Sequence, residues 1–254
     1  MQQVPVAEAV RGTARSSAGT GGWVRAVVRG AGELLITLGV VLLLFVGWQL
    51  WWTDVEAAQD RSRVTEQLQE AWAAEAPPAP TADPAPGAEP PSVPVPAEGE
   101  SFGVVYIPRF GKDYAVPATE GIGLESVLNK GVLGHYPGTA MPGEIGNFSL
   151  AGHRVTYGKP LNQIAELVPG DAIVVETADT WFVYRMREYE IVTPDRIDMV
   201  APVPGQPGAV PTERLLTLTA CHPMYSAKYR YIARAVLESW QPKGGDPPAA
   251  LSEG

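Results

Sequence analysis

An uninterrupted apolar run at Leu34–Trp52 places the strongest constraint on what this chain can fold into. The run carries no charged residue. As a helix at about 1.5 Å per residue it would extend roughly 28 Å, close to the thickness of a bilayer's hydrocarbon core. Trp48, Trp51 and Trp52 gather at one end, as aromatic residues do at a membrane interface. We therefore expect a transmembrane anchor over residues 34–52.

The charges that flank this run predict its orientation. Four arginines precede it, namely Arg11, Arg15, Arg25 and Arg29, and three acidic residues follow, namely Asp54, Glu56 and Asp60. The positive-inside rule makes residues 1–33 a cytoplasmic tail and places everything after the anchor outside the cell, in a single-pass membrane protein. A buried core helix of this length would carry a polar stripe. A cleavable signal peptide is the other alternative, since Val55-Glu56-Ala57 fits the small-residue cleavage rule, but the run is long for a signal core.

Composition divides the rest of the chain. Residues 53–100 are predicted to be a juxtamembrane segment, helical at 54–72, followed by a disordered linker, because residues 73–100 are dominated by Pro, Ala and Glu without periodicity. Residues 101–241 have the size of one domain. Residues 242–254 are predicted to be a disordered Gly/Pro/Ala tail.

The domain at 101–241 is predicted to be mainly β. Alternating or β-branched runs indicate strands at 102–107, 147–152, 172–176, 181–192, 215–223 and 229–237. Short helical segments are expected at 126–129 and 160–167, and Gly and Pro mark loops at 131–146 and 193–213. Many short strands and little helix favour an antiparallel barrel or sandwich.

Charge and motif content exclude several functions. The formal net charge is −9 and no cluster of Lys and Arg offers a phosphate-binding surface, so a nucleic-acid partner is not expected. With three His and one Cys the chain lacks the ligand spacing of a zinc site, and neither a phosphate loop nor a Gly-x-Ser-x-Gly elbow is present. We expect neither a metal nor a cofactor.

The single cysteine, Cys221, is the strongest candidate for chemistry. An unpaired cysteine in an extracytoplasmic domain is either buried and inert or retained because it reacts. An inert core residue is the default for an isolated cysteine. Here Cys221 ends a predicted strand beside Pro223, and strand ends and loops carry sites. A thiol near a cation or imidazole is the more reactive kind, which favours a nucleophile.

Three histidines could serve as its proton partner. His153 ends a predicted strand and is our first candidate for general acid/base. His135 lies in a turn-rich loop that could line a groove and is the second. His222 follows Cys221 directly, so its side chain should point to the opposite face and be structural. Without the cysteine, each would be an ordinary surface or hydrogen-bonded histidine.

Arg230 lies on the strand after Cys221 and could donate to a developing oxyanion while remaining charged. Strand alternation puts Lys228 and Arg234 on the same face, so both compete for this role. A solvated basic face is the alternative explanation.

These residues together resemble the sortases, the cysteine transpeptidases of Gram-positive cell walls. The family's signature strand, Thr-Leu-x-Thr-Cys, is matched by Thr217–Cys221 except that Ala220 replaces the usual Thr. The order His153, Cys221, Arg230 is also the family's. Residues 134–140 and the Cys-His-Pro step at 221–223 most resemble the class E, housekeeping-type sortases of actinobacteria.

The resemblance implies an eight-stranded β-barrel and a two-step reaction. Cys221 would attack the Thr–Gly bond of a C-terminal sorting signal on a secreted protein, and an amine of a peptidoglycan precursor would release the thioacyl-enzyme. His153 would be the general acid/base and Arg230 the oxyanion donor. The class E signal resembles Leu-Ala-x-Thr-Gly rather than Leu-Pro-x-Thr-Gly. The implied substrate contacts are Tyr136, which would read the second position of the signal, with His135, Thr219 and Ala220.

Three alternatives to a sortase remain. A cysteine peptidase would hydrolyse the same thioacyl intermediate. An L,D-transpeptidase would require a Ser-His-Gly-Cys type run, which Thr219-Ala220-Cys221 does not supply. A membrane-tethered barrel that only binds would leave the thiol without a role.

Overall fold

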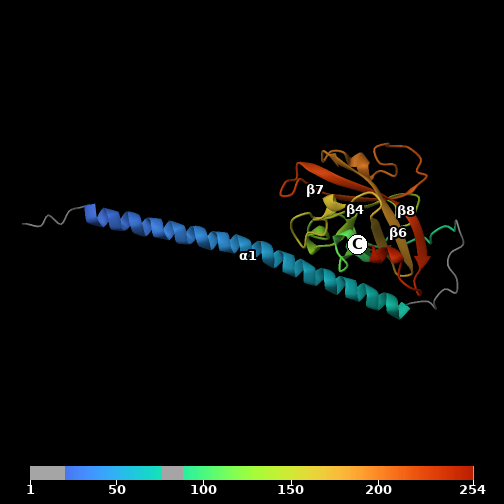
Figure 1. Ribbon diagram of the computed structural model, residues 1–254, viewed down its shortest axis with the longest axis horizontal. Helices are drawn as coiled ribbons and strands as arrows, with labels where there is room; N and C mark the ends of the chain where they lie inside the picture. The colour runs from blue at the N-terminus through green and yellow to red at the C-terminus, as the bar shows by residue number, and fades with distance from the viewer. Residues whose placement is uncertain (1–20, 76–87, 254) are drawn as a thin grey trace, which may run out of the picture. The chain divides into compact units, whose positions relative to one another are not determined.

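The computed structural model describes residues 21–75 and 88–253 of the chain (Figure 1). Residues 1–20 of the predicted tail, residues 76–87 of the predicted linker and residue 254 lie outside the described residues. The chain divides between Gln49 and Leu50 into two compact units. Each unit is described by itself below.

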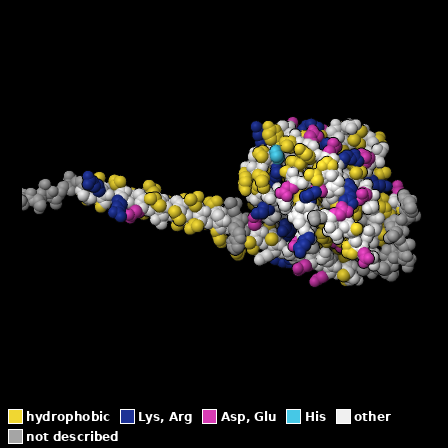
Figure 2. Space-filling model, in the orientation of Figure 1, with side chains coloured by type: hydrophobic (Ala, Val, Ile, Leu, Met, Phe, Trp, Pro, Cys, Tyr) yellow, Lys and Arg dark blue, Asp and Glu magenta, His cyan; other side chains and the backbone are white. Residues whose placement is uncertain are grey.

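A single helix, α1 (Gly21–Glu75), contains both the predicted anchor and the predicted juxtamembrane helix. Its apolar side chains between Leu34 and Trp48 are exposed, and Figure 2 shows them along the visible face of the helix. Within the described ranges, α1 is the one helix long and apolar enough to cross a bilayer. The helix has no polar stripe in this region, as expected for a segment that a bilayer rather than a protein core would surround.

Eight strands form the second unit's closed barrel (Figure 1). They are β1 (Ser101–Tyr106), β2 (Ala115–Glu120), β3 (Leu133–His135), β4 (Gly146–Ala151), β5 (Ala172–Glu176), β6 (Thr180–Val192), β7 (Arg214–His222) and β8 (Tyr229–Pro242). Their order around the barrel is β1-β2-β3-β4-β7-β8-β6-β5. The eight-stranded barrel that the family resemblance implied is therefore confirmed.

Two neighbouring pairs in this barrel, β2–β3 and β4–β7, are parallel, so the sheet is mixed rather than purely antiparallel as the sequence suggested. The strand β2 was not predicted because Pro117 interrupts a run that also contains Ala and Glu, residues that are depleted in strands. The strand β3 has only three residues and lies inside the Gly-rich segment that was assigned to loops.

Apart from residues 50–75 of α1, the described helices of the barrel unit are all single turns of 3-10 helix. They are η1 (Pro108–Phe110), η2 (Leu128–Lys130), η3 (Ile164–Glu166), η4 (Ile197–Val200) and η5 (Ala249–Ser252). The helix expected at 160–167 shortens to η3, and the long loop expected at 193–213 contains η4.

The ordered domain extends beyond the predicted limits of 101–241. Val93, in the predicted linker, is buried in the main core cluster, and Trp240 donates its indole N–H to the carbonyl of Ala88 at 3.0 Å. In the predicted tail, Ala250 is buried and Glu253 pairs with Arg185. Isolated apolar residues in a Pro-rich segment thus fill gaps on the barrel surface, which composition alone does not reveal.

The core fills the barrel interior with every second residue of each strand. On β7 these are Leu216, Leu218 and Ala220, which pack with Phe148 and Leu150 of β4. The intervening residues of β7, Thr217 and Thr219, face the outside of the barrel, yet they too are buried because the loops around β3 and η4 cover them. Cys221 belongs to this outer, loop-covered face.

Candidate active site

The strand register brings the three predicted reactive residues into one row. In the parallel pair β4–β7, Ala151 lies opposite Thr219, and the N–H of Gly152 donates to the carbonyl of Thr219 at 3.1 Å. Two residues farther along come Cys221, still on β7, and His153, in the segment that directly follows β4. In the antiparallel pair β7–β8, Cys221 lies opposite Arg230. Because neighbouring strands are about 4.8 Å apart, the imidazole, thiol and guanidinium occupy adjoining strand ends.

The thiol of Cys221 is free and the residue is half-buried. The fully buried residues Leu216 and Leu218 precede Cys221 on β7. Met224, in the turn between β7 and β8, is exposed. The cysteine therefore lies where the strand emerges from the core. The sealed, inert environment that was the alternative for a lone cysteine is not observed.

The imidazole of His153 is held by an amide that the sequence reasoning missed. Its Nε2 lies 2.9 Å from Oδ1 of Asn129, while Nδ2 of Asn129 donates to Glu125 at 3.0 Å. Because the amide nitrogen already donates to Glu125, its oxygen accepts the proton on Nε2. The neutral ring then keeps its lone pair on Nδ1.

The surroundings of His153 favour this neutral form. Burial lowers the pKa of His153 below its ordinary value, because a charged imidazolium loses hydration there. The ring of Tyr157 lies 5.2 Å from the imidazole, centroid to centroid. The half-buried ring is therefore neutral at pH 7 and able to accept a proton on Nδ1.

Lys228 and Arg234, the other candidates for the oxyanion donor, make different contacts from Arg230. Arg234 lies opposite Thr217 and is paired with Glu188 at 3.1 Å and with Glu190 at 3.3 Å.

Lys228 lies over the ring of Tyr229, 5.1 Å from its centroid. Arg230 instead donates from Nη1 to the carbonyls of Ala227 and Tyr229 at 3.0 and 3.1 Å. These bonds to uncharged carbonyls fix the guanidinium near the turn between β7 and β8 without neutralising it.

On the other face of the same strand ends, Arg154 contacts the backbone of the nucleophile candidate. Its Nη1 donates to the carbonyl of Cys221 at 3.3 Å and to Nδ1 of His222 at 2.8 Å, and its guanidinium lies 5.9 Å from the ring centroid of Tyr231. His222 thus points away from the His153 side, as strand alternation predicted. In the sequence, the one feature that could have identified Arg154 was its position next to His153.

Tyr136 and Thr219 come together beside the row. The Thr219 hydroxyl donates to the carbonyl of Leu150 at 3.3 Å and accepts from the Tyr136 hydroxyl at 3.0 Å. The loop after β3 is thereby tied to β7 two residues before Cys221. A segment bound along β7 would meet this tyrosine.

Two of the four predicted substrate contacts are core residues instead. His135 is fully buried, with Nδ1 2.5 Å from Glu120 and Nε2 2.8 Å from the Thr139 hydroxyl, so the expectation that it lines a groove is wrong. Ala220 points into the barrel and packs in the main core cluster. Its replacement of the family's Thr therefore changes the interior of the barrel rather than a substrate-facing surface.

Among the residues that the structure describes, no group of three or more His, Cys, Asp or Glu side chains is placed to hold a metal ion. The chemistry available at the row is that of the thiol, the imidazole and the guanidinium. The closed barrel carries the thiol, the imidazole and the guanidinium at adjoining strand ends. The protein therefore belongs to the class of β-barrel proteins whose reactive centre is a cysteine.

Comparison with known proteins identifies the family within this class. Residues 105–238 match the family described as "Sortase domain". Sortase SrtE1 of Streptomyces coelicolor is 41% identical over 229 residues, and Sortase SrtE2 of the same organism is 32% identical over 230 residues. The chain belongs to the sortase family, whose members are cysteine transpeptidases.

The extent of these matches differs. The alignment with Sortase SrtE1 covers 88% of this chain but 60% of that protein, and the alignment with Sortase SrtE2 covers 87% and 86%. A crystal structure titled as Sortase E1 from Streptomyces coelicolor with a tripeptide in the active site superposes with a TM-score of 0.56 at 41% identity, covering 61% of this chain and 99% of that one. The class E assignment made from the sequence is thus confirmed.

Proposed function

We propose that this chain is a membrane-anchored sortase that cleaves a Leu-Ala-x-Thr-Gly or Leu-Pro-x-Thr-Gly-like sorting signal between Thr and Gly and transfers the protein to a peptidoglycan amine. The observation that carries the proposal is the row of Cys221 on β7, Arg230 opposite it on β8, and His153 two residues past the end of β4. Strand pairing sets the positions of the nucleophile and the cation, and β4 leads directly to the proton carrier, which supports this assignment. Secreted proteins bearing the signal are the donor substrates.

In the first half-reaction Nδ1 of His153 takes the proton of the Cys221 thiol, and the sulfur bonds to the carbonyl carbon of the signal's threonine. The carbonyl oxygen becomes an oxyanion, and Arg230 donates hydrogen bonds to it. The C–N bond to glycine then breaks, and the leaving amine takes a proton from the imidazole of His153. The product of this step is a thioester with Cys221.

In the second half-reaction the acceptor amine attacks the thioester carbonyl and gives a proton to His153. The C–S bond breaks, and the sulfur of Cys221 takes this proton back from His153 before another cycle. The Nε2–H of His153 is already bonded to Asn129. This arrangement supports Nδ1 as the atom that exchanges the proton.

The segment Leu34–Trp52 of α1 supports a membrane location. Positive charge before the segment and acidic residues after it support a cytoplasmic N-terminus and an extracellular barrel. The hydrogen bond from Tyr136 to Thr219 supports Tyr136 as a contact for the second position of the signal.

The proposal is tested by incubating the full chain in detergent micelles with peptides ending in either signal and an amine acceptor, followed by mass spectrometry. We expect a thioacyl adduct on Cys221 and a peptide joined to the amine. Hydrolysed peptide alone, at any amine concentration, would identify a peptidase instead. Reversible peptide binding without an adduct would identify a binding barrel.

A further inference from the structure

A short piece of α1 in the barrel unit, residues 54–61, lies against two loops of the candidate site. Ala57 at its centre is 3% exposed. A Cβ built on Gly131 would lie 3.0 Å from the Cβ of Ala57, and one on Gly158 would lie 3.2 Å from it. Both glycines have positive φ, 76° and 71°, which favours glycine. The two glycines therefore form a notch that a single methyl group fills.

The two sides of this notch belong to the two loops that carry the His153–Asn129 hydrogen bond. Gly131 follows the turn η2, which contains Asn129. Gly158 follows Tyr157, whose ring contacts the imidazole of His153. A Cβ on Gly131 would also lie 2.9 Å from the carbonyl oxygen of Tyr157, so the two loops already touch where the methyl group enters.

Polar contacts hold the helix to one side of the notch. The carboxylate of Asp54 accepts the N–H of Gly158 at 3.1 Å and pairs with the ammonium of Lys159 at 2.8 Å. Arg61 donates from Nη1 to the carbonyl of Gly158 at 3.4 Å. Both backbone groups of Gly158 are thus bound by side chains about two turns apart on the helix.

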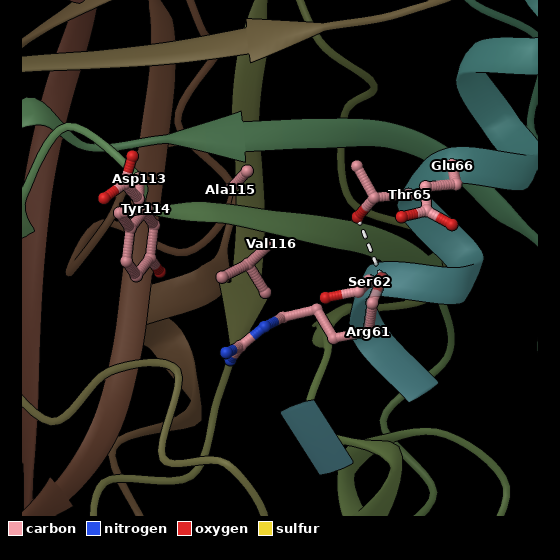
Figure 3. Close-up of a pocket in the computed structure, with 8 residues that line it drawn as sticks. All are labelled: Arg61, Ser62, Thr65, Glu66, Asp113, Tyr114, Ala115 and Val116. Carbon is pink, nitrogen blue, oxygen red and sulfur yellow. Dashed lines mark hydrogen bonds between the residues drawn. The ribbon is translucent and has the colours of Figure 1, made fainter. Parts of the chain in front are cut away.

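The barrel supports the same loop from its other side. Tyr114, at the start of β2, donates its hydroxyl to the carbonyl of Pro160 at 2.9 Å. Figure 3 shows the Arg61 side chain extending from the helix toward Val116 and Tyr114 across a hollow of about 240 Å³. The loop at 158–160 is consequently held between the helix and β2, whereas the hollow leaves the next turn of the helix less closely packed.

We propose that residues Asp54–Arg61 are a positioning element for His153. By filling the notch and binding Gly158, this juxtamembrane segment keeps the loops of His153 and Asn129 together, so that the imidazole keeps its orientation toward Cys221. The inference rests on the proposed function, because it assigns His153 the role of proton carrier. The segment that directly follows the predicted membrane anchor thereby helps to position a residue that acts on the substrate.

The experiment compares two equal changes on one helix of the full chain in detergent micelles. Ala57→Leu adds bulk that the notch cannot hold, whereas Ala71→Leu adds the same bulk at an exposed position. We expect Ala57→Leu to lower kcat for acyl transfer about 10-fold or more, with KM for the sorting peptide changed less than about 3-fold, because orientation rather than binding is lost. Ala71→Leu should match the wild type.

A double-mutant cycle separates positioning from a general loss of structure. Asn129→Ala removes the amide that holds His153, so adding Ala57→Leu to it should cost no more than about 2-fold further, since both changes release the same ring. The NMR signal of the protonated His153 ring nitrogen should weaken in Ala57→Leu as in Asn129→Ala. The midpoint of urea unfolding followed by tryptophan fluorescence serves as the check that the barrel is folded.

Three results would overturn the proposal: wild-type kcat in Ala57→Leu, equal loss in Ala71→Leu, or multiplicative losses in the double variant. If the wild-type chain transferred no acyl group to any peptide, the proposed function would fail instead. The His153 signal would then decide whether the segment positions the ring.

Discussion

Cys221 and Arg230 occupy directly opposed positions in the β7–β8 ladder. Directly opposite residues of an antiparallel pair have Cβ atoms about 4.5–5.5 Å apart. The separation of the two Cβ atoms is therefore set by backbone hydrogen bonds rather than by a flexible loop. Because Arg230 also donates to two carbonyls of the adjoining turn, its planar head is oriented before any substrate arrives, which is the condition for effective charge stabilisation in a transition state.

Replacing Arg230 should reduce turnover strongly. Loss of one preorganised oxyanion donor costs about 10²–10³ in kcat, so Arg230→Ala is expected to fall in this range for acyl transfer. Arg230→Lys should recover part of the loss, since it keeps the charge without the planar fork. The matched control is Arg234→Ala, which breaks ion pairs with Glu188 and Glu190. A greater loss of kcat in the control than in Arg230→Ala would assign the oxyanion role to Arg234.

The three groups near the β7 terminus should respond differently to removal. Cys221→Ala and His153→Ala are each expected to abolish transpeptidation, because one removes the nucleophile and the other the proton carrier. His222→Ala should retain much of the activity, since His222 contacts Arg154 on the opposite face. Intact-protein mass spectrometry checks this through the thioacyl adduct. Full activity in His153→Ala together with none in His222→Ala would reverse the assignment of the base.

The sequence was more informative about the three candidate reactive residues than about the residues that surround them. Cys221, His153 and Arg230 could be found because each sits at a strand end and the strands follow simple alternation. The residues that hold them could not. Asn129 lies in a turn whose distance to His153 depends on how η2 folds back, and the fit of Ala57 depends on two glycines far apart in the chain. Contacts of this kind arise from tertiary packing, on which local pattern carries no information.

The error over His135 has a similar physical origin. A histidine in a Gly-rich segment looks exposed, but β3 is a short strand paired on both sides, with Glu120 of β2 and Leu150 of β4 as its neighbours. Its buried ring is tolerated because Glu120 and Thr139 satisfy both nitrogens. A buried partner at a separation of fifteen residues could not be recognised before the strands were paired.

This assignment makes His135 a matter of stability rather than of chemistry. His135→Ala leaves the Glu120 carboxyl buried without its partner, and an unsatisfied buried hydrogen-bonding group costs about 1–3 kcal/mol of unfolding free energy, and more when it is charged. Glu120→Gln should cost less, since the amide still hydrogen-bonds the ring. Urea unfolding followed by tryptophan fluorescence gives both values. Unchanged stability with altered peptide specificity in His135→Ala would instead place this histidine at the substrate.

The lowered pKa of His153 gives the protein a stability that depends on pH. In the unfolded chain a histidine takes up a proton near pH 6.5, whereas the folded protein resists protonation of His153 because burial disfavours the charge. The unfolded state therefore binds more protons just below this pH. The stability that neutral His153 contributes is fully present above about pH 6.5 and is lost as the pH falls through the lower folded pKa.

This dependence separates His153 from the other titrating groups. On going from about pH 7.5 to 5, the wild type should lose more unfolding free energy than His153→Gln, whose amide does not titrate. An NMR titration of the wild type should place the midpoint of His153 protonation below pH 6.5. The value of kcat/KM for the acceptor amine should fall at acid pH with the same midpoint, because a protonated Nδ1 can no longer accept the proton of the incoming amine. Asn129→Asp tests the cause, since a carboxylate at Nε2 should raise the midpoint. Parallel stability curves for the two proteins, or an Asn129→Asp midpoint equal to that of the wild type, would show that His153 is not the buried, amide-held base described above.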